Sequence, residues 1–593
     1  MVRAPTYLGN VSSVSGSSLL IELGPQVSSG LLVIGGKTHR VGQVGSFVRI
    51  PQGYNDLYGL IAETSESSST GNDHITLATE RRWLKVELIG EAVGNQFERG
   101  ISQYPSINDE AHLVVEADLK KIYGEIDSSQ ITIGTLSSSD GIKVSVDLDK
   151  LVTRHSAVLV STGSGKSTSV SSLLRSIVTN DEGNFLHPSA RIVLIDIHGE
   201  YSSALKDIAE IFSILPRDHE HPLHIPYWCV SPESLIEFLF GSISDANRSV
   251  ILDKIVEDKQ DSLAANKFDD VSIDRITAYT PLPFRLKKIW YDLTVADSAN
   301  WEDKEKTIPA FTDKGDAIKL IPPKFKPPAP GSAAPFKGEG GKIKKQLELM
   351  RSRLLDNQYS FFLSPGEWEP DEDLKIKKDL PNLLEAWIGH DKPITILDLS
   401  GMPSARMDLL LGSVLDILFE SAIWGRNQNA GMKNRPLLLV LEEAHRYLST
   451  DVTGVAKEMV QKIAKEGRKF GVGAMLVSQR PSEIDETILS QCGTLFALRI
   501  NNSSDRNRVR SAMSEGMAGI VDSLPVLRSG EAVITGEAAK MPMRCRFKLP
   551  KPGNFPDSKD PKVSESWSRP LQDEDYTKLV SSWRNQDAYN DRT

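Results

Sequence analysis

One stretch, Ser156–Thr168, constrains the fold of this chain more than any other, and it reads SAVLVSTGSGKST. Residues Ala157–Val160 are apolar, as in a short buried strand, and a tight turn follows at Gly163–Gly165. A predicted helix opens at Lys166 and continues to Thr179. A strand, a glycine loop and a helix in this order are the setting of a phosphate-binding loop. The sequence therefore predicts an α/β fold built around a nucleotide site.

The residue types in this loop suit the binding of phosphate and a metal ion. Glycines let backbone N–H groups approach phosphate oxygens, and the start of a helix favours negative charge. Lys166 would reach the β- and γ-phosphates, and Ser167 would hold Mg²⁺. The candidate binding residues are Thr162, Gly163, Ser164, Gly165, Lys166, Ser167 and Thr168.

The loop departs from the strict pattern at one position, because Val160 stands five residues before Gly165 where a glycine is usual. That position usually lies at the end of the strand, so its side chain need not disturb the turn. A Gly/Ser turn before an ordinary helix is the alternative, but Lys166 and its setting favour the phosphate loop.

Length and composition bound the class of protein. The chain has 593 residues, too many for a single hydrophobic core, and its 39% hydrophobic and 25% charged residues are typical of a soluble globular protein. No apolar run has membrane-spanning length, and no signal peptide is evident. The three cysteines (Cys229, Cys492 and Cys545) lack metal-binding spacing, which suits a reducing cytoplasm. The net charge of −10 argues against a basic surface overall, but not against a local basic channel.

Residues 1–124 have the pattern of a β-rich assembly or docking region. Short apolar or alternating runs recur there between Gly, Ser or Asn turns, and this spacing predicts a small barrel or sandwich. The runs are Ser18–Glu22, Gly30–Ile34, Ser46–Ile50, Leu57–Ala62, His74–Leu77 and Trp83–Ile89.

From Ile131 the pattern changes to strands alternating with helices. The continuous apolar run Arg191–Ile195 predicts a parallel strand that is buried on both faces. Asp196 and Glu200 follow it, at the carboxyl edge where open α/β sheets bind ligands. The alternative role for Asp196 is to cap the next helix.

Two acids after another buried strand complete the predicted nucleotide site. Leu437–Leu441 is followed by Glu442 and Glu443, the Walker B arrangement. Glu442 would order the Mg²⁺ shell, and Glu443 would orient or deprotonate the attacking water. Gln479 follows the predicted strand Gly473–Val477 and could touch the γ-phosphate or its water. The alternatives are acidic residues that cap a helix and a strand-end glutamine of no special role.

Residues 217–389 interrupt the alternation of strands and helices. Helices are predicted from Ser231 and over Gln346–Asp356. Between them, 321–345 is rich in Pro, Gly and Lys, which predicts a mobile loop. Such a basic loop could touch DNA phosphates, and a plain linker is the alternative.

Two further features carry less information. His219, His221 and His224 cluster in the insertion, but without cysteine or regular helical spacing they suit a loop better than a metal site. Beyond Pro550 the tail is polar with scattered aromatic residues, which predicts an extended segment that docks on another surface.

Several segments together resemble the HerA branch of the HerA/FtsK translocases. They are RHSAVLVSTGSGKST from Arg154, DIHGEY from Asp196, EEAH from Glu442, EGRKFG from Glu466 and SQRPSEI from Ser478. The β-rich region is also similar, through the segments VGSFV and FERGIS. The order and spacing of these motifs make the resemblance specific, and it covers roughly 1–210 and 390–549.

The resemblance implies a RecA-like P-loop ATPase core with an N-terminal β-barrel and a helical insertion, assembled into a homo-hexameric ring. The implied divisions are 1–124 (barrel), 125–216 and 390–549 (two parts of the ATPase core), 217–389 (insertion) and 550–593 (extended tail). The family uses ATP and Mg²⁺ to pump double-stranded DNA through the ring. Its partner is a nuclease such as NurA or, in antiviral operons, another effector such as a sirtuin-type NADase.

The resemblance also implies roles for individual residues. Glu443 would be the catalytic base and Gln479 the sensor. Arg468 would be the finger that reaches the γ-phosphate of a neighbouring subunit, and Arg154 a second basic contact near the nucleotide. Without the resemblance, Arg468 would be interpreted as a surface charge at a helix end.

The leading hypothesis is therefore a ring-forming, ATP-driven translocase or helicase for double-stranded DNA, acting with an effector in DNA end processing or antiviral defence. A secretion or conjugation ATPase shares the core, but the lack of a membrane segment and the barrel-like N-terminus count against it. A third alternative is a scaffold that assembles and activates a defence effector, with nucleotide as a switch. We expect a cytoplasmic protein without membrane contact.

Overall fold

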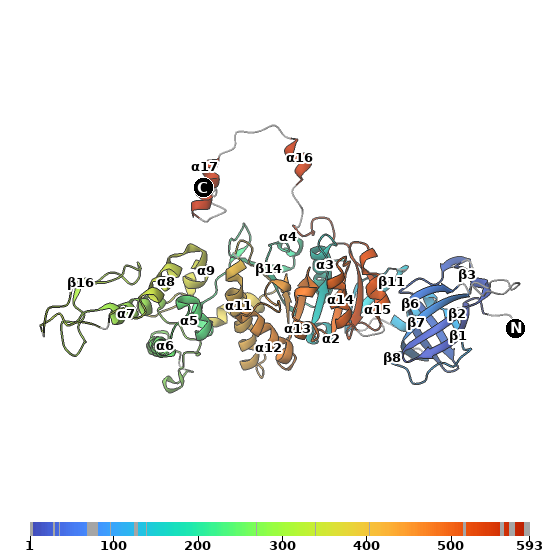
Figure 1. The fold of residues 1–593 in the computed structure, drawn as a ribbon, viewed down its shortest axis with the longest axis horizontal. Helices are drawn as coiled ribbons and strands as arrows, with labels where there is room; N and C mark the ends of the chain where they lie inside the picture. Colours follow the sequence, from blue (N-terminus) through green and yellow to red (C-terminus); the bar gives the residue numbers. More distant parts are fainter. Residues whose placement is uncertain are drawn as a thin grey trace, which may run out of the picture.

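The computed structural model describes residues 4–27, 30–34, 36–67, 81–94, 96–123, 128–137, 139–268, 270–331, 333–338, 340–402, 404–513, 517–557, 562–568 and 576–585. These residues form an elongated molecule with three parts in a row (Figure 1). The N-terminal strands lie at one end, a large sheet with its helices lies in the middle, and the helices of the insertion lie at the other end.

The N-terminal strands close into a barrel, which confirms the predicted fold of this region. Six strands follow the order β2-β1-β9-β5-β6-β7, β2 pairs with β7 to close the ring, and β8 is added on β7. Alternating residues such as Val11, Ile21 and Val86 point inward and form a buried core. The bounds are β1 (Tyr7–Ser15), β2 (Ser18–Leu23), β5 (Phe47–Gln52), β6 (Asn55–Ser67), β7 (Arg81–Val93), β8 (Gln96–Arg99) and β9 (Glu110–Leu113), with a separate hairpin of β3 (Leu31–Ile34) and β4 (Lys37–Arg40). The expected strand at His74–Leu77 lies outside the described residues.

A 12-stranded sheet forms the middle part, in the order β11-β10-β23-β22-β21-β12-β20-β19-β13-β18-β14-β15. Neighbouring strands run parallel from β21 to β15 and antiparallel from β11 to β21. The central strands β12, β20, β19 and β13 are buried along their whole length, so both faces of the sheet are covered. The bounds are β10 (Gln130–Leu136), β11 (Ser139–Asp147), β12 (Ser156–Leu159), β13 (Arg191–Asp196), β14 (Ala209–Ser213), β15 (His221–Pro222), β18 (Ile394–Asp398), β19 (Leu437–Leu441), β20 (Val472–Ser478), β21 (Thr494–Ala497), β22 (Glu531–Gly536) and β23 (Met543–Phe547).

Helices connect the strands of the sheet close to where the sequence predicts them. Their bounds are α1 (Glu116–Tyr123), α2 (Leu148–Thr153), α3 (Lys166–Val178), α4 (Ser202–Leu205), α11 (Ser404–Trp424), α12 (Val455–Phe470), α13 (Glu486–Leu489), α14 (Ser503–Ala512) and α15 (Ala518–Asp522). One close approach depends on Gly473, at the start of β20. A Cβ on this residue would lie 1.5 Å from the carbonyl oxygen of Val152 in α2, so only glycine lets the two elements meet.

The insertion is mainly helical, as predicted. Its helices are α5 (Pro232–Phe240), α6 (Asp245–Asn266), α7 (Leu286–Ser298), α8 (Lys344–Leu355), α9 (Ser360–Leu363) and α10 (Leu380–Leu384). α5 begins at the predicted cap, where the Ser231 side chain accepts a hydrogen bond from the backbone of Ser234. Within the segment 321–345, expected to be a mobile loop, β17 (Lys324–Phe325) pairs with β16 (Phe311–Asp313), and α8 begins at Lys344.

The described part of the tail carries two short helices, α16 (Val563–Trp567) and α17 (Tyr576–Asn585), where the sequence predicts an extended chain. Trp567 and Trp583 are 86% and 76% exposed, so neither indole belongs to the core. Among all helices of the described residues, none combines the length and apolar character needed to cross a bilayer.

The barrel is anchored to the central sheet by Arg99 of β8. The guanidinium donates hydrogen bonds to the carbonyl oxygens of Gly536, Ala539 and Lys540, at 2.7, 2.7 and 3.0 Å. β22 ends at this contact, and its other end follows Gly530, whose N–H donates to the P-loop. A single strand therefore connects the barrel to the nucleotide loop.

Candidate nucleotide site

The central sheet brings the predicted nucleotide residues to one edge. The glycine loop follows β12, Glu442 and Glu443 follow β19, and Gln479 follows β20, while Asp196 ends β13. Because these strands are consecutive neighbours in the order β12-β20-β19-β13, the four segments meet at their carboxyl ends. Open α/β sheets bind ligands at this edge.

Two glycines give the phosphate loop its shape. Gly163 and Gly165 have φ angles of 75° and 84°, in the left-handed region that glycine enters without strain. Helix α3 starts directly after Gly165, so the unpaired backbone N–H groups of its first turn lie at the loop. Thr162 is exposed at the start of the loop, Ser164 is buried, and Thr168 is half-buried in the first turn of α3.

Lys166 lies buried between the two acids of the Walker B strand. Its Nζ donates to Oε1 of Glu442 at 2.7 Å and to Oε1 of Glu443 at 2.5 Å. Burial would lower the pKa of Lys166, but the charges of the two carboxylates and their hydrogen bonds outweigh it and raise the pKa. The ammonium is therefore charged at neutral pH. It binds the carboxylates of Glu442 and Glu443, and phosphate oxygens can take their place.

Glu443 is held in a strained position. Its backbone is left-handed, with φ of 47°, which is uncommon for a residue other than glycine. Gln479 Nε2 donates to Oε1 of Glu443. Burial would raise the pKa of Glu443, but Lys166, Gln479 and His445 together lower it, so the carboxylate is ionised as a base must be. Its second oxygen, Oε2, is buried and lies 3.3 Å from Nδ1 of His445, but it accepts no hydrogen bond from the described residues.

Ser167 and Glu200 lie together at the same edge, where the Ser167 hydroxyl donates to Oε2 of Glu200. Asp196 shapes the turn between β13 and α4 that presents Glu200. Its carboxylate accepts three backbone N–H groups from this turn, at 2.8–3.2 Å, and α4 has no side-chain cap. Burial, with Glu442 nearby, raises the pKa of Asp196.

These side chains fit a nucleoside triphosphate and Mg²⁺. Mg²⁺ prefers oxygen ligands and keeps several waters, and Ser167, Glu200 and Glu442 offer a hydroxyl and two carboxylates. Lys166 and the loop N–H groups offer donors for phosphate oxygens. Oε2 of Glu443, which accepts no hydrogen bond from the described residues, offers an acceptor for a water.

The two predicted arginines lie at the opposite, amino-terminal edge of the sheet. Arg154 precedes β12, and its Nη1 lies 3.1 Å from Oε2 of Glu537. Arg468 is exposed on the last turn of α12 and forms no ion pair with any residue that the structure describes. Within one chain Arg154 lies away from the P-loop, because the P-loop follows β12 whereas Arg154 precedes it. Its contact with a nucleotide stays a prediction.

Arg499 contacts the P-loop and was not predicted. It follows β21, the strand beside β12. Its Nη2 donates to the carbonyl oxygen of Gly163 at 3.1 Å, and its Nε donates to Ser164 Oγ at 3.3 Å. Its backbone carbonyl accepts the N–H of Ser161 at 2.9 Å. Arg499 therefore holds the loop from both its side chain and its backbone.

Two histidines of the insertion have partners of their own. His221 Nε2 lies 3.1 Å from Oε2 of Glu210, and the ring of His224 packs on Trp368. Within the described ranges of the chain, no group of three or more His, Cys, Asp or Glu could hold a metal ion. His219 and His224 lie in loops, as predicted, whereas His221 lies in β15.

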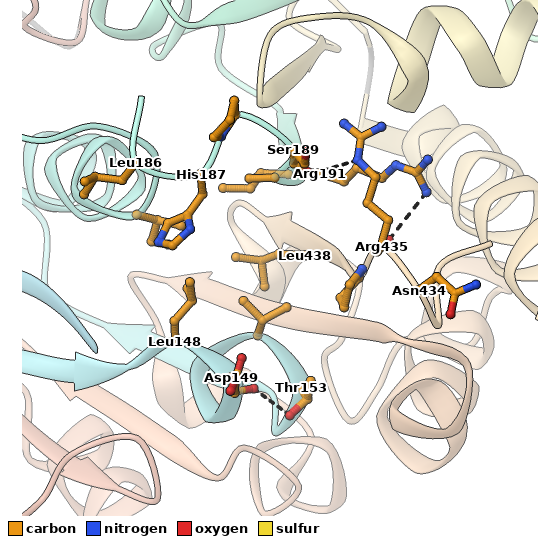
Figure 2. Close-up of a pocket in the computed structure, with 16 residues that line it drawn as sticks. Leu148, Asp149, Thr153, Leu186, His187, Ser189, Arg191, Asn434, Arg435 and Leu438 are labelled. Atoms are coloured by element: carbon orange, nitrogen blue, oxygen red, sulfur yellow. Dashed lines mark hydrogen bonds between the residues drawn. The ribbon is translucent and has the colours of Figure 1, made fainter. Parts of the chain in front are cut away.

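A separate cavity of about 390 Å³ opens at the amino-terminal edge of the sheet (Figure 2). Leu148, Leu186 and Leu438 form part of its apolar wall, and Arg191 and Arg435 lie at one side. None of the predicted nucleotide residues lines it, so this cavity is distinct from the P-loop site.

Comparison with known families and relatives agrees with the site. The family model "Helicase HerA, central domain" matches residues 131–417, and "Helicase HerA-like C-terminal" matches residues 412–545. The chain is 26% identical over 527 residues to the DNA double-strand break repair helicase HerA of Pyrococcus furiosus. This alignment covers 84% of this chain and 82% of the relative. It is 25% identical over 481 residues to the HerA helicase of Sulfurisphaera tokodaii, covering 81% of this chain and 80% of the relative.

Two solved structures are also similar to this chain. VirB4 of Thermoanaerobacter pseudethanolicus has a TM-score of 0.45 and 15% identity, covering 72% of this chain and 98% of that protein. The plasmid coupling protein TrwB in complex with ADP and Mg²⁺ has a TM-score of 0.42 and 13% identity, covering 75% of this chain and 95% of that protein. The two HerA models together span 131–545, well over half of the chain, and the protein therefore belongs to the HerA helicase family of P-loop ATPases.

Proposed function

We propose that the protein is a hexameric, ATP-driven translocase of double-stranded DNA that works with a nuclease or another effector subunit. Its relatives in Pyrococcus furiosus and Sulfurisphaera tokodaii are DNA double-strand break repair helicases. The P-loop site supports hydrolysis as the source of motion, because it holds a lysine, an ionised carboxylate and a glutamine in mutual contact.

The proposal of a ring rests on the observation that Arg468 and Arg154 lie away from the P-loop of their own chain. One chain offers the phosphate loop, the metal ligands and the base at the carboxyl edge, whereas Arg468 and Arg154 lie at the amino edge. Arg499 is nearby, but its guanidinium is engaged with the loop itself. A finger must therefore come from another copy of the chain, and an arginine in trans contributes about 10³–10⁵ in rate.

In this proposal each residue at the carboxyl edge has one role. Lys166 leaves the two glutamate carboxylates and binds the β- and γ-phosphates. Ser167 and Glu442 would hold Mg²⁺, and this ion would neutralise charge on the phosphates. Glu443 accepts the proton of the attacking water, and Gln479 fixes the position of that carboxylate. Thr162, Gly163, Ser164, Gly165 and Thr168 complete the phosphate-binding set.

Complementation between two inactive variants tests the role in trans. Arg468→Ala keeps the base but loses the finger, and Glu443→Gln keeps the finger but loses the base. Chains of the two kinds, mixed in equal amounts, should regain about a quarter of the wild-type ATPase rate, because a quarter of the interfaces pair an intact base with an intact finger. Full activity of Arg468→Ala alone, or no recovery on mixing, would contradict the proposal.

Dependence on DNA and on protein concentration tests the motor. Steady-state ATP hydrolysis should rise when blunt duplex DNA is added and should depend steeply on protein concentration. Robust hydrolysis by dilute monomer would refute the ring.

An effector partner in DNA end processing or antiviral defence completes the proposal. The three cysteines are free thiols, which fits action in the cytoplasm. The Glu443→Gln variant distinguishes a motor from a scaffold switched by nucleotide. If the output of a copurified effector persists without hydrolysis, the scaffold alternative replaces the motor.

A further inference from the structure

A lysine-rich segment lies at the end of the molecule farthest from the barrel (Figure 1). We define residues 314–345 as the lysine arm. It holds eight lysines and two acidic residues, in a chain whose net charge is −10. Positive charge is therefore concentrated on one segment of an acidic protein.

The backbone of the lysine arm contacts neighbouring elements of the insertion. The rings of Phe311 and Phe325 stack at 5.4 Å across the β16–β17 pair. Arg351 of α8 donates to the carbonyl oxygen of Leu320 at 2.7 Å, and Leu320 itself is buried. Tyr291 of α7 donates to the carbonyl oxygen of Lys314 at 2.6 Å. The arm is thereby attached to two helices of the insertion.

All the lysines of the arm face solvent. On β17, Phe325 packs against Phe311, so the alternation of a strand directs Lys324 to the other face. The exposed lysines are Lys314, Lys319, Lys324, Lys326, Lys337, Lys342, Lys344 and Lys345.

Few of these charges are neutralised within the chain. Lys319 lies 3.7 Å from Asp316, and Lys326 lies 2.8 Å from Glu302. Five others, Lys314, Lys324, Lys337, Lys344 and Lys345, form no ion pair with any carboxylate in the described part of the chain. The arm also contains no arginine, the side chain that most often reads guanine edges.

We propose that the lysine arm binds the phosphate backbone of double-stranded DNA beside the ring, without sequence preference. Lysine ammonium groups bind phosphates as point charges, and such contacts position a duplex without reading its bases. This inference rests on the proposed function, because it assigns the arm to the DNA that the ring would move.

A triple substitution in the full-length protein tests the arm. Lys314, Lys324 and Lys337 are changed to Gln, and a control protein carries the same change at the exposed Lys85, Lys206 and Lys433, so both lose three positive charges. Binding to a fluorescein-labelled duplex of mixed sequence is measured across a salt series. For the arm variant, the slope of log K against log salt should become shallower by about 0.9 for each lost phosphate contact. The control should keep the wild-type slope.

The outcomes separate this inference from the proposed function. An arm variant that keeps the wild-type slope and affinity would overturn the inference, even if wild-type protein binds DNA and hydrolyses ATP. Wild-type protein that neither binds duplex nor responds to it would instead overturn the proposed function. Loss of an acidic protein partner with unchanged DNA binding would show that the arm is a protein-docking surface, and the inference would again be wrong. Unchanged ATPase activity without DNA checks that the arm variant is folded.

Discussion

Arg499 is the residue that links the P-loop to the neighbouring strand. Its contacts to the Gly163 carbonyl and to Ser164 Oγ fix the position of the P-loop. Hydrogen bonds from charged groups contribute about 1.5–3 kcal/mol, and the half-exposed position of Arg499 favours the lower value.

Replacing Arg499 by Ala should therefore raise the KM for ATP about tenfold, with a smaller change in kcat. Arg499→Lys should recover part of the loss, because one donor remains. Steady-state kinetics across ATP concentration distinguish the two effects. A fall in kcat at constant KM would assign Arg499 to the chemical step instead.

His155, directly before β12, gives the stability of the fold a dependence on pH. The ring is buried, and its Nδ1 accepts the backbone N–H of Ala474 at 3.0 Å. Burial lowers the pKa of His155 below its ordinary value of 6.5. The neutral ring is therefore the folded form, and the unfolded chain takes up a proton first as the pH falls. Stability is complete above about pH 6.5 and decreases below it, towards the folded pKa.

His155→Asn isolates this contribution. Asn keeps an acceptor near the Ala474 N–H and tolerates the left-handed φ of 52° at this position. The loss of unfolding free energy between about pH 7.5 and pH 5.5 should be smaller in the variant, by at most about 1.4 kcal/mol per pH unit. Urea titrations at fixed protein concentration measure it. Parallel pH profiles of the two proteins would show that His155 is not responsible.

At the scale of elements, the contact between α2 and β20 places the start of the strand next to the end of the helix. Gly473→Ala would force a Cβ into the Val152 carbonyl, and both neighbours are backbone atoms that cannot rotate away. We expect a loss of about 3 kcal/mol or more in unfolding free energy. Gly141→Ala in β11 is the matched control, because nothing lies within 4 Å of the added atom, and it should change stability by less than about 0.5 kcal/mol. Equal melting temperatures would contradict the tight packing.

The sequence predicts most elements because their signals are local. Buried parallel strands such as β13 and β19 are continuous apolar runs, and α5 carries its capping serine directly before it. Arg499 has no such signal, since its partner Gly163 is 336 residues away and only the pairing of β12 with β21 brings them together. The segment 321–345 was predicted to be a mobile loop from its composition alone, which suits a linker. Its contacts with distant residues, such as the hydrogen bonds of the Gly341 and Ile343 N–H groups to Asp297 of α7, leave no local signal.

At the scale of the whole molecule, Arg99 holds the barrel to the sheet through three carbonyl oxygens. Because the side chain is partly exposed, Arg99→Ala should lower stability by only about 1–2 kcal/mol, but it should loosen the barrel selectively. Limited proteolysis should then cut between the barrel and the sheet sooner than in wild type. Arg82→Ala, which removes an exposed pair with Glu66, is the control. Identical cleavage of all three proteins would show that other contacts dock the barrel.

The 12-stranded sheet has a mechanical consequence. Its two ends are β11, next to the barrel, and β15, from which the insertion departs. A continuous set of hydrogen-bonded strands resists bending in the plane of the sheet. We therefore expect the barrel and the lysine arm, at the two ends of the sheet, to move together as one rigid unit. In the proposed ring, a power stroke would then tilt each whole subunit against its neighbours, and the displacement would grow with distance from the P-loop. Dyes placed at the two ends of one chain should keep a constant separation through the ATP cycle, while dyes on adjacent chains should not.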